Sequence, residues 1–164
     1  MRYQGRASAC GAVLALVTML ATSLTSATED RHAGYYYPPP ASTEVYRART
    51  MTLANVNRET RLGFVAGLTQ QMLSRSYPPQ YVIFAKGDEA EKLIIVSLYD
   101  DHLDTVYRAR ALFAMLTSVA RLTRFLTELG VADFFTFFDL AKLLGFTRIT
   151  ISDGDAFAHQ VIIE

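Results

Sequence analysis

The chain has 164 residues, 51 % of them hydrophobic, and its 16 Lys and Arg balance its 16 Asp and Glu. This balance excludes a protein that holds nucleic acid by bulk positive charge, because such domains carry a clear excess of Lys and Arg. The single cysteine excludes a disulfide framework and a cysteine cluster for zinc.

Residues 1–27 have the pattern of a secretory signal peptide. Two arginines precede an uncharged and mostly apolar stretch over residues 7–22, and Thr25–Ala27 supplies small residues for cleavage. We expect a periplasmic or secreted chain that begins at Thr28, with 137 residues, 14 basic against 16 acidic side chains, and no cysteine, since Cys10 leaves with the signal peptide. The alternative is an uncleaved segment, which would place the protein at a membrane.

Residues 28–42 predict an extended arm ahead of the folded domain. Pro38–Pro40 lack backbone donors and favour a polyproline-like path, and Tyr35, Tyr36 and Tyr37 precede them. These aromatic side chains are candidates for binding a partner protein. The alternative is an arm whose tyrosines pack on their own domain.

The first half of the domain predicts a strand, a helix and a hairpin. Residues 43–50 alternate like an edge strand. Asn57 is the expected N-cap of a helix that runs to about residue 75, and the face expected to be buried holds Leu62, Val65, Leu68, Met72 and Leu73. Two runs of β-branched or aromatic residues, at 81–85 and 93–98, flank a charged turn and predict a β-hairpin.

A helical pattern then extends from about residue 104 to residue 129, with Thr123 as the place where it can break. If the helix is continuous, Arg110, Arg121 and Arg124 lie on one polar stripe. Guanidinium groups form paired hydrogen bonds with phosphate or carboxylate oxygens, so these three residues are candidates for binding an anionic ligand. A solvated helix face is the alternative.

The last third predicts a short helix and a second hairpin. Thr136–Asp139 fits a capping box that starts a helix ending before Gly145. That helix is apolar nearly all round, which is typical of a helix in the centre of a core or one covered by a partner. Asp153-Gly154 lies between strand patterns at residues 147–152 and 156–163 and predicts a tight hairpin turn.

These elements together predict one α+β domain over residues 43–164. Two hairpins and three or four helices occur without a repeated strand–helix–strand rhythm. Such an order favours a mostly antiparallel sheet of four to five strands, with three to four helices packed on it.

A cluster of acidic residues and one histidine precedes the long helical pattern. Asp100, Asp101, His102 and Asp104 are residue types that bind hard metal ions or transfer protons, and His159 in the last strand would complete the set if the fold brought it near. The alternative is that the carboxylates cap the helix and the histidine belongs to a strand. Apart from a divalent metal at this cluster, we predict no cofactor.

Several short runs are distinctive, namely Arg31–Pro38, Gly67–Met72, Phe84–Gly87, Thr136–Gly145 and Ile149–Gly154. On these runs the chain resembles a family of small exported alphaproteobacterial proteins of unknown function, over nearly all of the sequence after residue 27. Some of these proteins carry the name molybdopterin-guanine dinucleotide biosynthesis protein A. That name implies a guanylyltransferase with a glycine-rich loop after its first strand, and no such loop follows an early strand here.

Three functional hypotheses follow from the sequence. The first is an exported domain that binds or assists another envelope component, either a protein or a small ligand, without nucleic acid as a partner. The second is a small metal-binding protein or enzyme that uses the Asp/His cluster. The third is the guanylyltransferase that the resemblance implies.

Overall fold

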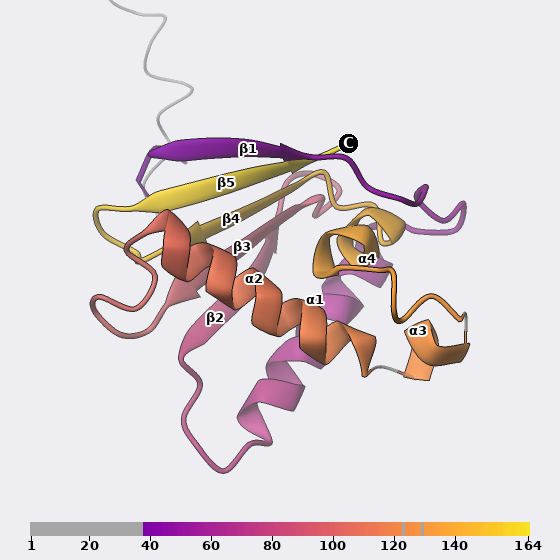
Figure 1. Cartoon of the computed structure of the whole chain (residues 1–164), viewed down its shortest axis with the longest axis horizontal. Coiled ribbons are helices and arrows are strands. Elements are labelled where there is room, and N and C mark those ends of the chain that lie inside the picture. Colours follow the sequence, from indigo (N-terminus) through magenta and orange to yellow (C-terminus); the bar gives the residue numbers. More distant parts are fainter. Residues whose placement is uncertain (1–37, 123, 129) are drawn as a thin grey trace, which may run out of the picture. The chain divides into compact units, whose positions relative to one another are not determined.

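The computed structural model describes residues 38–122, 124–128 and 130–164 (Figure 1). The predicted signal peptide and the three arm tyrosines lie outside these residues. The chain divides into two units, Met1–His32 and Ala33–Glu164, and only the second contains described residues. In the described part, no helix is long and apolar enough to cross a membrane.

A mixed five-stranded sheet forms the centre of the domain, with strand order β1-β5-β4-β3-β2. Two antiparallel hairpins, β2–β3 and β4–β5, are joined side by side through the parallel pair β3–β4, and β1 adds parallel to β5 at one edge. The bounds are β1 Ser42–Tyr46, β2 Tyr81–Lys86, β3 Lys92–Ser97, β4 Arg148–Ser152 and β5 Ala158–Ile163. The predicted α+β class is confirmed.

Four helices complete the fold, with bounds α1 Arg58–Leu73, α2 Val106–Arg121, α3 Arg124–Glu128 and α4 Phe137–Leu143. They share one hydrophobic core with a single face of the sheet. The strand residues in that core alternate along the chain, and they are Tyr81, Ile83, Leu93, Ile95, Ile149, Ile151, Val161 and Ile163. Because alternate strand residues point to opposite faces, the helices cover one face only.

The two predicted helix starts are confirmed. The side chain of Asn57 accepts a hydrogen bond from the backbone N–H of Thr60 at 2.9 Å. Thr136 and Asp139 form the predicted capping box at the start of α4. The buried residues of α4 include Phe137, which is 2 % exposed. This helix therefore lies in the centre of the core, as one of the two alternatives predicted.

Two predicted boundaries are wrong, and the possible break in the long helical pattern is confirmed. The first strand ends at Tyr46 instead of residue 50, because its neighbour in the sheet, β5, ends at Ile163, the register partner of Tyr46. The helical pattern divides into α2, which ends at Arg121, and α3, which begins at Arg124, as the possible break near residue 123 allowed. The last strand begins at Ala158 instead of residue 156, after a loop over residues 153–157 in which Asp153 Oδ1 accepts three backbone N–H bonds.

The buried face of α1 also differs from the prediction. Leu62 and Leu73 are exposed, at 36 % and 66 %. Arg61 is buried instead, and its Nε donates to the carbonyl oxygen of Glu89 at 2.7 Å. A long arginine side chain takes a place in the interior here because its polar end has a backbone acceptor.

Candidate functional site

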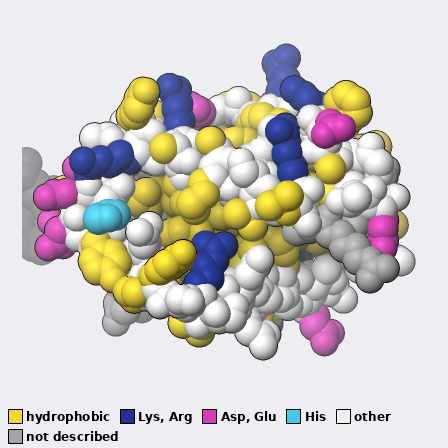
Figure 2. All heavy atoms as spheres, turned by 60° about the horizontal axis from the view of Figure 1, so that its bottom comes forward, with side chains coloured by type: hydrophobic (Ala, Val, Ile, Leu, Met, Phe, Trp, Pro, Cys, Tyr) yellow, Lys and Arg dark blue, Asp and Glu magenta, His cyan; other side chains and the backbone are white. Residues whose placement is uncertain are grey.

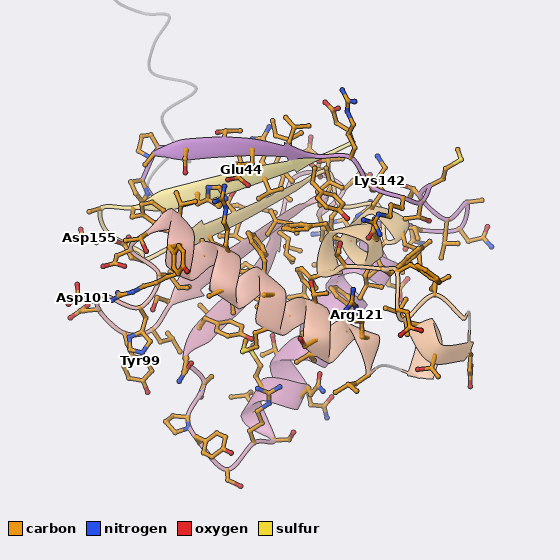
Figure 3. All side chains as sticks on the ribbon, viewed as in Figure 1. Glu44, Tyr99, Asp101, Arg121, Lys142 and Asp155 are labelled. Atoms are coloured by element: carbon orange, nitrogen blue, oxygen red, sulfur yellow. The ribbon has the colours of Figure 1, made fainter. Side chains whose placement is uncertain are left out.

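The predicted acidic cluster lies in the connection from β3 to α2, and its contacts are local. Asp104 forms an ion pair with Arg108 at 2.8 Å, one turn along α2. His102 Nδ1 lies 3.2 Å from the carbonyl oxygen of Asp100. Asp101 has a left-handed backbone with φ of 60° and is exposed in the loop (Figure 3). These residues shape the turn before α2.

His159 lies apart from that cluster, on β5 under α2, where its ring centroid is 6.4 Å from that of Phe113. Among the described residues, no group of three or more His, Cys, Asp or Glu side chains is arranged to hold a metal ion. The five predicted metal ligands are therefore not brought together, and the metal hypothesis gains no support from the geometry.

The predicted arginine stripe is divided between separate partners. Arg110 forms an ion pair with Glu44 of β1, and Arg121 Nε donates to the carbonyl oxygen of Phe135 at 3.1 Å. Figure 3 shows Glu44 near the first half of α2 and Arg121 at its last turn. Their eleven-residue separation corresponds to about 16 Å along the helix, too far to clamp one small anion. Arg124 belongs to α3, and its side chain is outside the described part.

A buried polar pair joins the two strands at the β1 edge. Ser42 Oγ lies 2.8 Å from Nδ1 of His159, whose side chain is fully buried. The other ring nitrogen, Nε2, has no hydrogen-bond partner in the described residues, and its nearest carboxylate oxygen, Glu44 Oε2, is 3.9 Å away. Burial lowers the pKa of His159, against an opposing effect of Glu44, and the charge of Arg110 lowers it further. The imidazole is therefore held neutral near pH 7.

Ser42, His159 and Glu44 have the side-chain types of a serine hydrolase triad, but not its arrangement. In such a triad the serine bonds Nε2 and the carboxylate bonds Nδ1. Here the serine lies at Nδ1, and the carboxylate of Glu44, 3.9 Å from Nε2, makes no hydrogen bond to the ring. His159 is 0 % exposed, and Ser42 lines none of the three hollows described below. The cluster fits a structural role between β1 and β5 better than catalysis.

A second buried polar cluster holds β1 against α4. Asp139 is 0 % exposed and accepts hydrogen bonds from the backbone N–H groups of Arg49 and Thr136, both at 2.8 Å. The hydroxyl groups of Tyr46 and Thr136 also lie within 3.0 Å of its Oδ2. Burial alone would raise the pKa of Asp139, but these hydrogen bonds outweigh it and lower that pKa. The carboxylate is fully used inside the protein, so it is not available to a ligand.

Three adjoining hollows in the described part of the chain form an apolar groove over the start of β2. Two hollows of about 220 Å³ and one of about 140 Å³ share Tyr81 in their walls. We call this surface the Tyr81 groove. Its walls come from the end of α1, the chain before β2 and the middle of α2, and they include Met72, Arg75, Pro79, Gln80, Tyr81, Leu112 and Met115.

Local sequence explains why the groove is open. Pro78 and Pro79 cannot continue α1 and direct the chain into β2, which lies at the edge of the sheet opposite β1. In Figure 1 the C-terminal half of α1 and the N-terminal half of α2 diverge, with β2 between them. The space between the two helices is therefore not filled, and the side chains that line it stay accessible.

Several apolar residues that line the groove are exposed. Leu73 and Tyr77 are 66 % and 75 % exposed, and Met115 is 38 % exposed. Figure 2 shows apolar side chains gathered in the middle of this face, with basic side chains beside them. Burial raises the pKa of Tyr81, and the positive charge of Arg75 opposes this. Arg75 and Tyr81 line the same hollow, so Arg75 is placed beside a group bound against Tyr81.

Sequence reasoning named only one residue of this groove as functional. His102, predicted as a metal ligand, lines one of the hollows instead. Tyr77, Pro78 and Pro79 mark only a helix stop in the sequence, and Tyr81 only a strand. One signal could have indicated the groove. More large apolar residues lie around that helix stop than the buried face of one helix requires.

Comparison with known proteins gives no family assignment, because no family model matches the chain and no curated protein or solved structure matches it significantly.

Proposed function

We propose that the chain is an exported binding domain that takes an apolar segment of another envelope protein into the Tyr81 groove. The observation that carries this proposal is the groove itself, where Met72, Tyr81 and Met115 line an open surface between α1 and α2. Export is supported by the signal-peptide pattern of residues 1–27.

A polypeptide fits this surface better than a small molecule. Pockets that bury drug-sized ligands have volumes of about 300–1,000 Å³, and each hollow here is smaller. Leu73 and Tyr77, which also line the hollows, are exposed and add to the apolar surface that a longer segment could cover. Methionine side chains adapt to irregular partners, and tyrosine is enriched at the centres of protein interfaces.

The charge at the groove indicates the character of the segment. Arg75 is the one Arg, Lys, Asp or Glu among the residues that line the three hollows. A partner with two or three apolar side chains and a neighbouring carboxylate would bury its apolar groups on Met72 and Met115 and pair its charge with Arg75.

The test is selection of random peptides displayed on phage against the immobilised protein. We expect enriched peptides to combine apolar residues with Asp or Glu, and Met115→Glu to weaken their binding at least tenfold by placing a charge in the groove. Leu122→Glu is the matched control, because Leu122 is an exposed apolar residue at the end of α2 that lines none of these hollows. Peptides that bind both variants as well as the wild type would refute the groove as the binding site.

Export is tested separately by expressing the chain with its native N-terminus in a Gram-negative host and measuring the intact mass of the periplasmic protein. A mass that begins at Thr28 supports export and cleavage. Retention of the whole chain in the cytoplasm would contradict this part of the proposal without affecting the groove.

A further inference from the structure

The sheet face opposite the helices carries a continuous row of side chains across all five strands. The strand registers pair Thr43 with Gln160, Gln160 with Thr150, Thr150 with Ile94, and Ile94 with Phe84. All five side chains point to the face from which the hydrophobic core takes no residue.

The middle of this row is buried. Ile94 and Thr150 are each 1 % exposed, although the core with its helices lies on the other side of the sheet. The ends of the same face are more open, with Phe84 at 37 % and Val45 at 56 %. A sheet face in contact with water leaves its central side chains partly accessible, so these values indicate a face suited to being covered.

The chain that precedes β1 starts next to this face. Ala41 donates its backbone N–H to the carbonyl oxygen of Ala158 at 2.8 Å, which fixes the N-terminal end of β1 beside β5. On the helix side this position is already filled by Ser42 against His159.

The length of the arm matches the width of the sheet. At about 3.1 Å per residue in a polyproline-like path, residues 33–40 extend about 25 Å. Five strands spaced about 4.8 Å apart span about 19 Å from β1 to β2. Tyr35, seven residues before Ser42, then reaches about 22 Å, which corresponds to the position of Phe84 on β2.

We propose that residues 33–40 of this chain lie across the sheet face opposite the helices, with Tyr35–Tyr37 covering Ile94 of β3 and Phe84 of β2. Tyrosine rings supply large apolar area, and a proline-rich segment loses little conformational entropy when it is fixed. The arm is thus part of the fold and not a docking segment for a partner. This inference is independent of the Tyr81 groove, which lies on the helix side.

The test is thiol cross-linking in the full chain carrying Cys10→Ser. Because stacked layers lie about 10 Å apart, a bismaleimide of that length suits the pair Tyr35→Cys with Phe84→Cys better than a direct disulfide. Tyr35→Cys with Met115→Cys is the matched control, since Met115 is 38 % exposed and Phe84 37 %, on opposite faces. We expect a high yield of monomeric cross-linked product for the Phe84 pair and little for the control.

Three outcomes would overturn the proposal: equal yields from both pairs, no product from the Phe84 pair, or a product that is mainly a covalent dimer. The last would mean that the arm of a second copy covers the face. An independent measurement uses the triple variant Tyr35→Ser, Tyr36→Ser and Tyr37→Ser, which should lower Tm and increase binding of an apolar dye. An unchanged Tm and unchanged dye binding would also count against the arm.

Discussion

The hydroxyl group of Tyr46 lies 3.0 Å from Oδ2 of Asp139, and this contact ties the edge strand β1 to the start of α4 across 93 residues of sequence. The same carboxylate also accepts the backbone N–H groups of Arg49 and Thr136. One buried charge thus fixes the path of the chain after β1 and the N-terminus of α4 together.

Replacement of this carboxylate should be costly. In Asp139→Asn an amide takes the place of one acceptor oxygen and leaves buried donors without a partner, so we expect a loss of about 2–3 kcal/mol in the free energy of unfolding. Urea denaturation measures it. Tyr46→Phe, which removes one hydroxyl and leaves the other three donors, is the control and should cost about 1 kcal/mol. Equal costs for the two variants would contradict this account.

Asp139 should also contribute to the acid sensitivity of the fold. Its pKa is lowered in the folded state from the ordinary value of 3.8, so its contribution to stability is complete above that value and is lost as the pH falls through the lower, folded-state pKa. Unfolding free energies at a series of acidic pH values should show a smaller decline for Asp139→Asn than for the wild type. Parallel profiles would show that other groups cause the loss.

His159 should act at milder pH, and folding favours its deprotonated form as it does for Asp139. Its folded-state pKa is lowered from 6.5, so the neutral ring is favoured by folding. Stability is complete above pH 6.5, and it declines as the pH falls from 6.5 towards the folded-state pKa, because the unfolded chain takes up a proton first. NMR titration of the ring measures this pKa directly.

Glu44 provides a control for the histidine. Its charge raises the pKa of His159 against the larger effect of burial, so Glu44→Gln should lower that pKa further. A pKa of His159 that rises in Glu44→Gln, or one that equals 6.5 in the wild type, would contradict the arrangement of Ser42, His159 and Glu44 described above.

Local sequence predicted the caps at Asn57 and Thr136 because each cap depends only on residues within four positions along the chain. The pair Ser42–His159 is separated by 117 residues and depends on β1 lying parallel to β5, which no local pattern specifies. The Tyr81 groove depends on how far two helices diverge. In the sequence, the residues that line the groove therefore cannot be distinguished from ordinary core and turn residues.

The exposed ion pair between Arg110 and Glu44 should contribute little to stability. Their side chains are 62 % and 39 % exposed, so solvent and salt screen the attraction. We expect Arg110→Ala to change the free energy of unfolding by less than about 1 kcal/mol.

Inorganic phosphate should not raise Tm more than chloride at matched ionic strength. A phosphate-specific rise that disappears in Arg110→Ala would restore the predicted anion site.

Gly145 is the position after α4 where a side chain should be least tolerated. Its φ is +75°, a region that residues with a Cβ rarely adopt, and a Cβ there would lie 2.6 Å from Nη1 of Arg61. Arg61 is buried and bound to Glu89, so it has little freedom to move away. Gly145→Ala should therefore destabilise the fold by about 1–3 kcal/mol. Gly130→Ala is the matched control, because Gly130 has a φ of +68° with nothing near its Cβ position, and it separates the cost of the backbone from that of the contact. If both variants unfold at the same urea concentration, the contact with Arg61 adds nothing to the cost.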